Sequence, residues 1–250
     1  MRTEMKTTTR LCAAAVAATS PFVFAFAFGA AGAASAQAGA EMLRVVIGVS
    51  KAPASAAVHE LALANASCVS TTAGRSAPGA NRSLPVTWSR GPAGTRSYAL
   101  TLIDPDVPLN LSTLNQPGTS IAFDAPRQEF VHWVLADIPG DRTTLPEALD
   151  GDGHLQGGLP LERTVYGVRG QNGFAAFMKD GPYGGYMGPC PPWNDERVHR
   201  YRVTVYALDV DTLGLSGAFS RADLLRAMKT HVLATGSASV DYFVNRGARR

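Results

Sequence analysis

Three stretches of the chain have the composition of β-strands, and this feature restricts the fold more than any other. They are rich in β-branched and aromatic residues, and loops rich in Gly, Pro and Asn separate them, notably at residues 109–128 and 139–169. Strands that are joined by irregular loops favour an antiparallel sheet over the parallel sheet of an α/β protein. The three stretches are residues 97–102, 129–138 and 200–210.

Alternation of side chains gives each stretch two faces. In residues 200–210, one face carries Tyr201, Val203 and Val205, and the other carries Arg202, Thr204 and Tyr206. In residues 129–138, one face carries Phe130, His132, Val134 and Ala136, and the other carries Val131, Trp133 and Leu135. We expect the first stretch to end at Asp104-Pro105, because proline cannot donate to a β-ladder.

The remaining segments add short strands and one helix. Residues 43–49 and 240–244 have the pattern of short strands, whereas residues 50–83 give no clear pattern. Ser220 and Asp223 form a capping pair ahead of apolar residues at helical spacing, which are Leu224, Leu225, Met228, Val232 and Leu233. The sequence therefore predicts a mainly β protein, an antiparallel β-sandwich with a few peripheral helices, one of them near the C-terminus.

The first 36 residues have the features of a secretory signal peptide. Three basic residues precede an uncharged apolar run at residues 11–34, and the small residues Ala34-Ser35-Ala36 follow. The alternative is a membrane anchor, but Thr19, Ser20 and Pro21 interrupt the run. We expect cleavage after Ala36, a single domain over residues 37–250 and a soluble periplasmic or secreted protein without a transmembrane anchor.

Charge and cysteine content limit the function classes. The formal net charge of the chain is +3, and removal of the leader would reduce it to +1, which does not suggest a nucleic-acid partner. Two cysteines, Cys68 and Cys190, would remain. They could pair in an oxidising compartment, but the sequence leaves this open.

Several polar residues stand at or near the ends of the predicted strands. Asp104 and Asp106 flank Pro105, His132 interrupts an apolar strand, and His199 follows a loop rich in Gly and Pro at residues 188–192. Exposed amides in such a loop and nearby imidazoles can bind an anion. Each residue alone also fits an ordinary structural role, such as a buried histidine or an aspartate in a turn.

Taken together, these segments resemble the phosphatidylethanolamine-binding protein (PEBP) family, and in particular its bacterial YbhB/YbcL branch, which is Raf kinase inhibitor-like. The order and approximate spacing agree over residues 81–242. The resemblance rests on Asp104-Pro105-Asp106-Val107-Pro108, His132-Trp133, Gly188-Pro189-Cys190-Pro191-Pro192 and His199-Arg200-Tyr201.

The resemblance implies a large antiparallel sheet packed on a smaller one, and a pocket that binds phosphate-like anions, including the head group of phosphatidylethanolamine. It implies a binding protein that is not an enzyme, with no catalytic residue, metal or cofactor. The pocket would be lined by Asp104, Asp106, Pro108, Phe130, His132, Tyr186, Gly188, Pro191, Pro192, His199 and Tyr201, with Phe130 and Tyr186 near its mouth.

Two other functions stay open at this point. The chain could inhibit a protease or a kinase by protein contact, for which the long loop at residues 109–128 is the best candidate surface. It could also be a hydrolase or a metal-dependent enzyme that uses Asp104, His132 and His199, since two histidines and a carboxylate can bind zinc.

Overall fold

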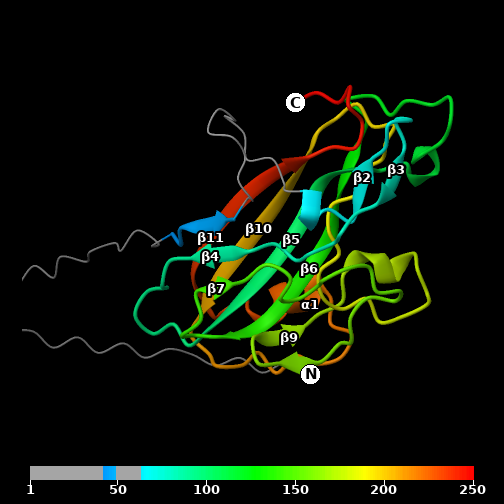
Figure 1. The fold of residues 1–250 in the computed structure, drawn as a ribbon. Helices are drawn as coiled ribbons and strands as arrows, with labels where there is room; N and C mark the ends of the chain where they lie inside the picture. Colours follow the sequence, from blue (N-terminus) through cyan, green and yellow to red (C-terminus); the bar gives the residue numbers. More distant parts are fainter. Residues whose placement is uncertain (1–41, 49–62) are drawn as a thin grey trace, which may run out of the picture. The chain divides into compact units, whose positions relative to one another are not determined.

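The large sheet is built around the three stretches that the sequence predicts as strands. The computed structural model describes residues 42–48 and 63–250, which belong to one compact unit. Within it, β6, β5 and β10 lie side by side as long antiparallel strands (Figure 1). They span Ser97–Pro108 (β5), Arg127–Pro139 (β6) and His199–Leu208 (β10).

Three further strands complete this sheet. Its order is β11-β10-β5-β6-β9-β8, and all neighbouring strands are antiparallel. The predicted antiparallel β fold is therefore confirmed. The additional strands are β8 (Arg163–Thr164), β9 (Gly167–Arg169) and β11 (Val232–Tyr242).

A smaller sheet covers one face of the large sheet. Its order is β1-β4-β7, and a buried apolar cluster fills the space between the sheets, with Val86 and Trp88 from the small sheet and Leu100, Trp133 and Val203 from the large one. The small sheet consists of β1 (Val45–Ile47), β4 (Val86–Trp88) and β7 (Thr144–Leu145). The strands β2 (Cys68–Ser70) and β3 (Ser76–Pro78) pair with each other in a separate hairpin.

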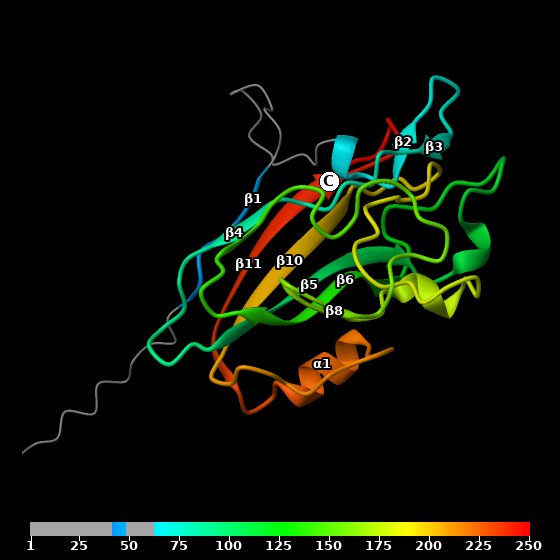
Figure 2. The ribbon, with the colours of Figure 1, turned by 60° about the horizontal axis from the view of Figure 1, so that its bottom comes forward.

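The helix α1 (Arg221–Ala227) covers the opposite face of the large sheet (Figure 2). Its N-terminus has the predicted capping box, in which the Ser220 side chain accepts from the amide of Asp223 and the Asp223 carboxylate accepts from the amide of Ser220. Leu224 and Met228 pack on Val134 of β6 in a second buried cluster. The described part of the chain also contains three 3₁₀ helices, which are η1 (Leu63–Asn65), η2 (Leu111–Thr113) and η3 (Gly173–Ala176).

The helix is shorter and the last strand longer than predicted. Val232 and Leu233 belong to β11: Val232 pairs with Leu208 of β10, and Leu233 is skipped at a shift of the register before Ala234 pairs with Ala207. The strand predicted at residues 240–244 contains only the last part of β11. Helical spacing alone could not separate the two elements, since both are apolar on the side that faces the protein interior.

The prediction that β5 ends at Pro105 is also wrong. β5 continues to Pro108, although its pairing with β10 stops at Ile103, so no neighbour on that side needs an amide from Pro105. On the other side the register with β6 shifts between Asp104 and Val107. A β-bulge therefore accommodates the proline within the strand.

The predicted leader at residues 1–36, with cleavage after Ala36, lies outside the described residues. Residues 49–62 lie outside them as well. Over the part of the chain that the structure describes, no helix has the length and the apolar character needed to cross a membrane.

Candidate functional site

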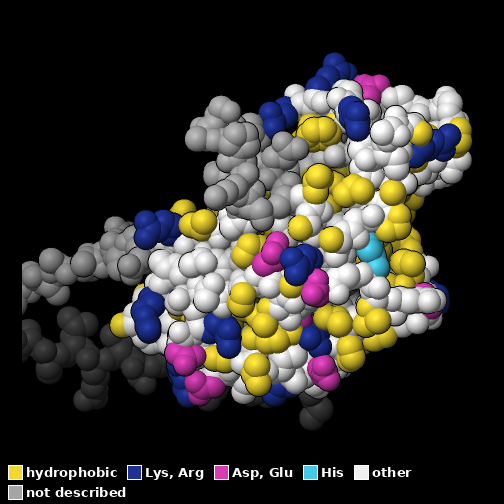
Figure 3. Space-filling model, viewed as in Figure 1, with side chains coloured by type: hydrophobic (Ala, Val, Ile, Leu, Met, Phe, Trp, Pro, Cys, Tyr) yellow, Lys and Arg dark blue, Asp and Glu magenta, His cyan; other side chains and the backbone are white. Residues whose placement is uncertain are grey.

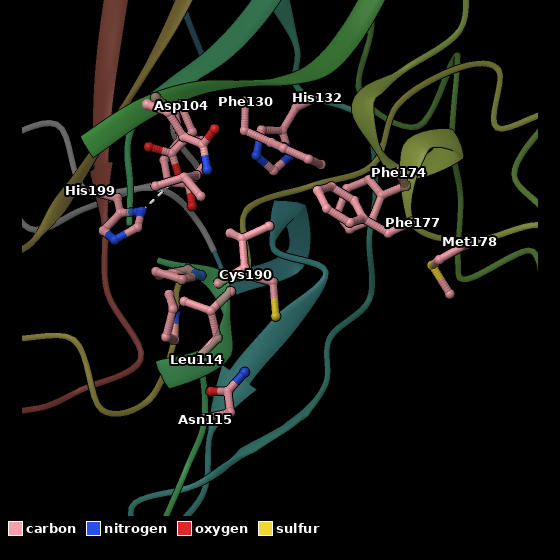
Figure 4. Close-up of a pocket in the computed structure, with 16 residues that line it drawn as sticks. Asp104, Leu114, Asn115, Phe130, His132, Phe174, Phe177, Met178, Cys190 and His199 are labelled. Atoms are coloured by element: carbon pink, nitrogen blue, oxygen red, sulfur yellow. Dashed lines mark hydrogen bonds and ion pairs between the residues drawn. The ribbon is translucent and has the colours of Figure 1, made fainter. Parts of the chain in front are cut away.

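A cavity of about 460 Å³ lies where the ends of β5, β6 and β10 meet η2, η3 and the 188–192 loop (Figure 4). Polar groups form one part of its wall and a larger apolar surface forms the rest. The wall consists of Asp104, Val107, Leu111, Leu114, Asn115, Gln128, Phe130, His132, Phe174, Phe177, Met178, Cys190, Pro191, Pro192, His199 and Tyr201.

A β-bulge in β6 places the side chain of His132 on the wall of this cavity. The pairing of β6 with β5 skips His132, which is therefore the extra residue of the bulge. Val131 packs in the cluster on the α1 side, as Val134 does, whereas the ring of His132 lies 5.2 Å from that of Tyr201 on the cavity side. The predicted common face of His132 and Val134 is wrong, because the extra residue shifts the alternation.

The bulge in β5 separates the two aspartates of the Asp-Pro-Asp sequence. Asp104 lies on the cavity wall and accepts a 2.8 Å hydrogen bond from the amide of Asp106. The carboxylate of Asp106 is directed elsewhere, where it accepts from Arg197 at 3.2 Å and from the amide of Arg200 at 2.9 Å. The two carboxylates therefore have different partners, and only the carboxylate of Asp104 lies at this cavity.

His199 is held between two carboxylates. Its Nδ1 lies 2.7 Å from Oδ2 of Asp104, and its Nε2 lies 3.1 Å from Oδ2 of Asp195. Burial would lower the pKa of His199, but the charges and hydrogen bonds of the two aspartates raise it to about 9. His199 is therefore an imidazolium at neutral pH, and both of its N–H groups are in use.

Arg127 neutralises the second of these carboxylates. Its two terminal nitrogens donate to both oxygens of Asp195, at 2.6 and 3.1 Å, and the guanidinium also donates to the carbonyls of Ala122, Ala125 and Asp106. Both side chains are buried. Arg127 thus joins the end of the 109–126 segment to the charged pair behind the cavity.

Asp104 remains ionised at the polar end of the cavity. Burial would raise the pKa of Asp104, but the charge of His199 and the hydrogen bond to it lower the pKa below its ordinary value. The Tyr201 hydroxyl is protonated, since burial and the charge of Asp104 raise its pKa well above 10. The polar end therefore presents a carboxylate that is partly neutralised from behind.

His132 is neutral and has one nitrogen without a proton. Its Nδ1 donates to the carbonyl of Met187 at 2.7 Å, so Nε2 carries the lone pair of the neutral ring. Burial lowers the pKa of His132 below its ordinary value, although the charge of Asp104 opposes this. At neutral pH the ring accepts a hydrogen bond, and it donates from Nε2 only after it takes up a proton.

Aromatic and aliphatic side chains form the rest of the wall. Phe130 packs edge-on against Phe174 and stacks on Phe177, with ring centroids 4.9 and 5.9 Å apart. Phe177 is 57% exposed and Met178 is 45% exposed, so this apolar surface continues from the interior to the solvent. Figure 4 shows Phe174, Phe177 and Met178 across the cavity from Asp104 and His199.

Seven of the eleven residues predicted for the pocket line this one cavity, although they come from distant parts of the chain. They are Asp104, Phe130, His132, Pro191, Pro192, His199 and Tyr201.

The other four predicted residues do not line the cavity. Tyr186 was expected near the mouth but is buried in the core, where its hydroxyl donates to the carbonyl of Asn65. Asp106 pairs with Arg197, as described above. Pro108 lines a separate cavity of about 300 Å³ beneath the 109–126 segment.

Gly188 has a packing role, because a Cβ on it would lie 2.3 Å from the carbonyl oxygen of Asn65. Its amide donates to Oδ1 of Asn81, and the prolines of the 188–192 loop have no amide hydrogen. The loop therefore offers an anion fewer donors than the sequence suggested.

The apolar wall and the second partner of His199 were not predicted from the sequence. Phe174, Phe177 and Met178 follow one another at helix-like spacing in a glycine-rich region, and this exposed aromatic cluster was the available signal. No pattern pointed to Asp195, because its role depends on contacts with His199 and with Arg127, which lies 68 residues away.

The structure resolves the cysteine question. Cys68 and Cys190 form a disulfide, which joins β2 to the loop that lines the cavity. Among the residues that the structure describes, no group of three His, Cys, Asp or Glu side chains is placed to hold a metal ion.

The sequence of this chain is similar to those of known proteins. A sequence model of the family described as "PBP: Phosphatidylethanolamine-binding protein" matches residues 54–243. A UPF0098 protein of Methanothermobacter thermautotrophicus is 35% identical over 68% of this chain and 86% of its own length. The UPF0098 protein YbcL of Escherichia coli is 29% identical over 66% of this chain and 73% of its own length.

The fold is also similar to that of a solved structure from this family. The crystal structure of Escherichia coli YbcL, described as a new member of the mammalian PEBP family, matches with a TM-score of 0.55 and 25% identity. The match covers 81% of this chain and 98% of that structure.

Proposed function

Because the chain belongs to the phosphatidylethanolamine-binding protein family, we propose that its cavity binds one small amphiphilic ligand with a phosphate-type head group, without changing it chemically. The observation that carries the proposal is that one cavity combines a small polar end, at Asp104 and His132, with a long apolar wall that reaches the solvent.

The apolar wall supports a ligand with a hydrocarbon part. Burial of apolar surface contributes about 25 cal/mol per Å², so acyl carbons along Phe130, Phe174 and Phe177 would supply much of the affinity. A free inorganic anion would gain nothing from this surface. The wall thus favours a lipid-like molecule over a simple anion.

The polar end supports a head group that carries both charges. Asp104 attracts an ammonium group, and His132 donates to a phosphate oxygen once its ring is protonated. Ethanolamine phosphate has both groups within one short chain. His199 takes part only through Asp104, because both of its nitrogens are engaged.

The arrangement gives little support to the hydrolase alternative. A general base at His199 would need a free ring nitrogen, and both face aspartates. The residues that line the cavity include no serine, threonine or lysine, and their one cysteine is in the disulfide.

We also propose that the protein works outside the cytoplasm. The Cys68–Cys190 disulfide supports an oxidising compartment, which agrees with the leader that the sequence predicts.

Isothermal titration calorimetry tests the ligand proposal with phosphorylethanolamine and dihexanoyl phosphatidylethanolamine. We expect the acyl-bearing ligand to bind at least tenfold more tightly, and Phe177→Ser to reduce that advantage. His132→Ala should weaken the binding of both ligands. The control is His231→Ala, since this exposed histidine pairs with Asp209 away from the cavity. Absence of binding by either ligand, or equal affinities in all four proteins, would refute the proposal.

A further inference from the structure

A second cavity, of about 360 Å³, lies on the other face of the large sheet and is lined by arginines. His199 and Tyr201 of β10 face the first cavity, whereas Arg200 and Arg202 alternate to the opposite side and line the second. The bulge in β5 turns Asp106 toward this side as well. The two cavities therefore lie back to back on the same strands.

Positive charge exceeds negative charge on this wall. Four arginines, at positions 197, 200, 202 and 250, face two aspartates. Asp106 pairs with Arg197, and Asp241 is shared by Arg200 and Arg250 at 3.6 and 2.9 Å. Arg202 has a 3.4 Å contact with Glu129, which Arg221 also contacts. The side chains of the wall therefore carry an excess of two positive charges.

The arginines are arranged so that a solvent-borne ligand can reach them. The side chains of Arg200, Arg202 and Arg250 are 65%, 44% and 51% exposed. Arg197 is held at the base, where its Nε donates to the carbonyl of Phe123 and its guanidinium lies over the Phe123 ring. Figure 3 shows basic side chains gathered at the top of the view, the end at which Figure 1 marks the C-terminus.

We propose that this arginine cavity is a second binding site, which takes a dianionic phosphate group. Guanidinium groups bind phosphate through two parallel hydrogen bonds, and two charges on the phosphate match the excess on the wall. The phosphate group is either free or carried by a small phosphomonoester. This site is independent of the apolar cavity, because the strands separate the two walls.

Calorimetry at low ionic strength tests the site with inorganic phosphate and with glycerol 3-phosphate as separate ligands. The double variant Arg200→Gln, Arg202→Gln should bind at least tenfold more weakly than wild type. Asp241→Asn should bind several-fold more tightly, a gain that misfolding cannot produce. Arg96→Gln is the matched control, since this exposed arginine pairs with Asp211 elsewhere. Equal affinities for the two ligands indicate a site for the phosphate alone, and tighter glycerol 3-phosphate indicates a phosphomonoester site.

His132→Ala separates this site from the proposed function. Phosphate binding should survive in that variant even if the apolar cavity binds no ligand at all. The proposal is overturned if His132→Ala abolishes phosphate binding, if the double arginine variant binds like Arg96→Gln, or if no saturable binding occurs.

Discussion

Oδ2 of Asp195 lies 3.1 Å from Nε2 of His199, and this contact occupies the one ring nitrogen that Asp104 leaves open. An imidazole between two carboxylates must donate from both nitrogens, so it is charged and unable to bind a ligand directly. The polar end of the cavity therefore consists of Asp104 and His132, and His199 sets the charge that surrounds them.

Asp195→Asn should lower the pKa of His199 from about 9. In the wild type this pKa lies above the ordinary 6.5, so the stabilisation from His199 is complete below about pH 6.5 and is lost as the pH rises through about 9. In the variant the loss should begin near the same pH and end at a lower pH, and the free energy of unfolding at pH 7 should fall by about 3 kcal/mol. Urea unfolding between pH 6 and 10 measures both effects.

Asp124→Asn is the control for this experiment, because Asp124 is exposed and lies outside the charged pair. It should leave the pH profile of stability unchanged. If NMR titration of the imidazole nitrogens gives the same pKa for His199 in Asp195→Asn and in wild type, the contact does not have the effect described.

Arg127→Leu should destabilise the protein by about 3–5 kcal/mol, since it leaves the buried carboxylate of Asp195 without a partner. Arg96→Leu removes an exposed ion pair instead and should cost less than about 1 kcal/mol. Chemical denaturation of the two variants makes the comparison. Addition of Asp195→Asn to Arg127→Leu should restore part of the stability, and a simple sum of the two losses would contradict this interpretation.

Binding of phosphorylethanolamine should become weaker as the pH rises from 5.5 to 8. The pKa of His132 lies below its ordinary value in the free protein, so a phosphate that needs the charged ring binds together with a proton. Calorimetry in two buffers with different ionisation enthalpies measures this proton uptake. In His132→Gln the pH dependence should largely disappear, and an affinity that rises with pH in the wild type would refute the coupling.

Reduction of the Cys68–Cys190 disulfide should lower stability by about 2–5 kcal/mol, because it joins residues 122 positions apart. Ligand binding should weaken too, since Cys190 lines the cavity. Unfolding with and without dithiothreitol measures the first effect. The double variant Cys68→Ser, Cys190→Ser is the control, and any response of that protein to dithiothreitol would show that the effect has another origin.

Where one face of a strand is buried, the sequence predicted the structure well. The alternation of Tyr201, Val203 and Val205 appears in β10 as predicted, and the capping box at Ser220 starts the one α-helix of the described chain. In both cases the signal is local, since neighbouring residues alone determine which side chains share a face or cap an end.

The errors at His132 and at the end of β5 have a common physical cause. Both features depend on how a neighbouring strand pairs, which the residues of the strand itself do not show. Nothing in residues 129–138 shows that β5 skips His132, and nothing around Pro105 shows that β10 has already stopped pairing there. The candidate site was predicted largely through the family resemblance, which placed seven residues on one wall. Tyr186 does not line the cavity, because its side chain is buried in the core, where the hydroxyl donates to a backbone carbonyl 121 residues away.

The bulge at His132 also determines how this strand can change in length. Loss of His132 would remove the extra residue, so Ile103 would still face Val131 and Leu102 would still face Trp133, now in regular pairing. Val131 would stay on the α1 side and Phe130 on the cavity side, and the cavity would lose only the ring of His132. The bulge therefore adds one imidazole to the cavity wall without changing the face of any other residue of β6, and a deletion at this position should remove the ring while the sheet is kept.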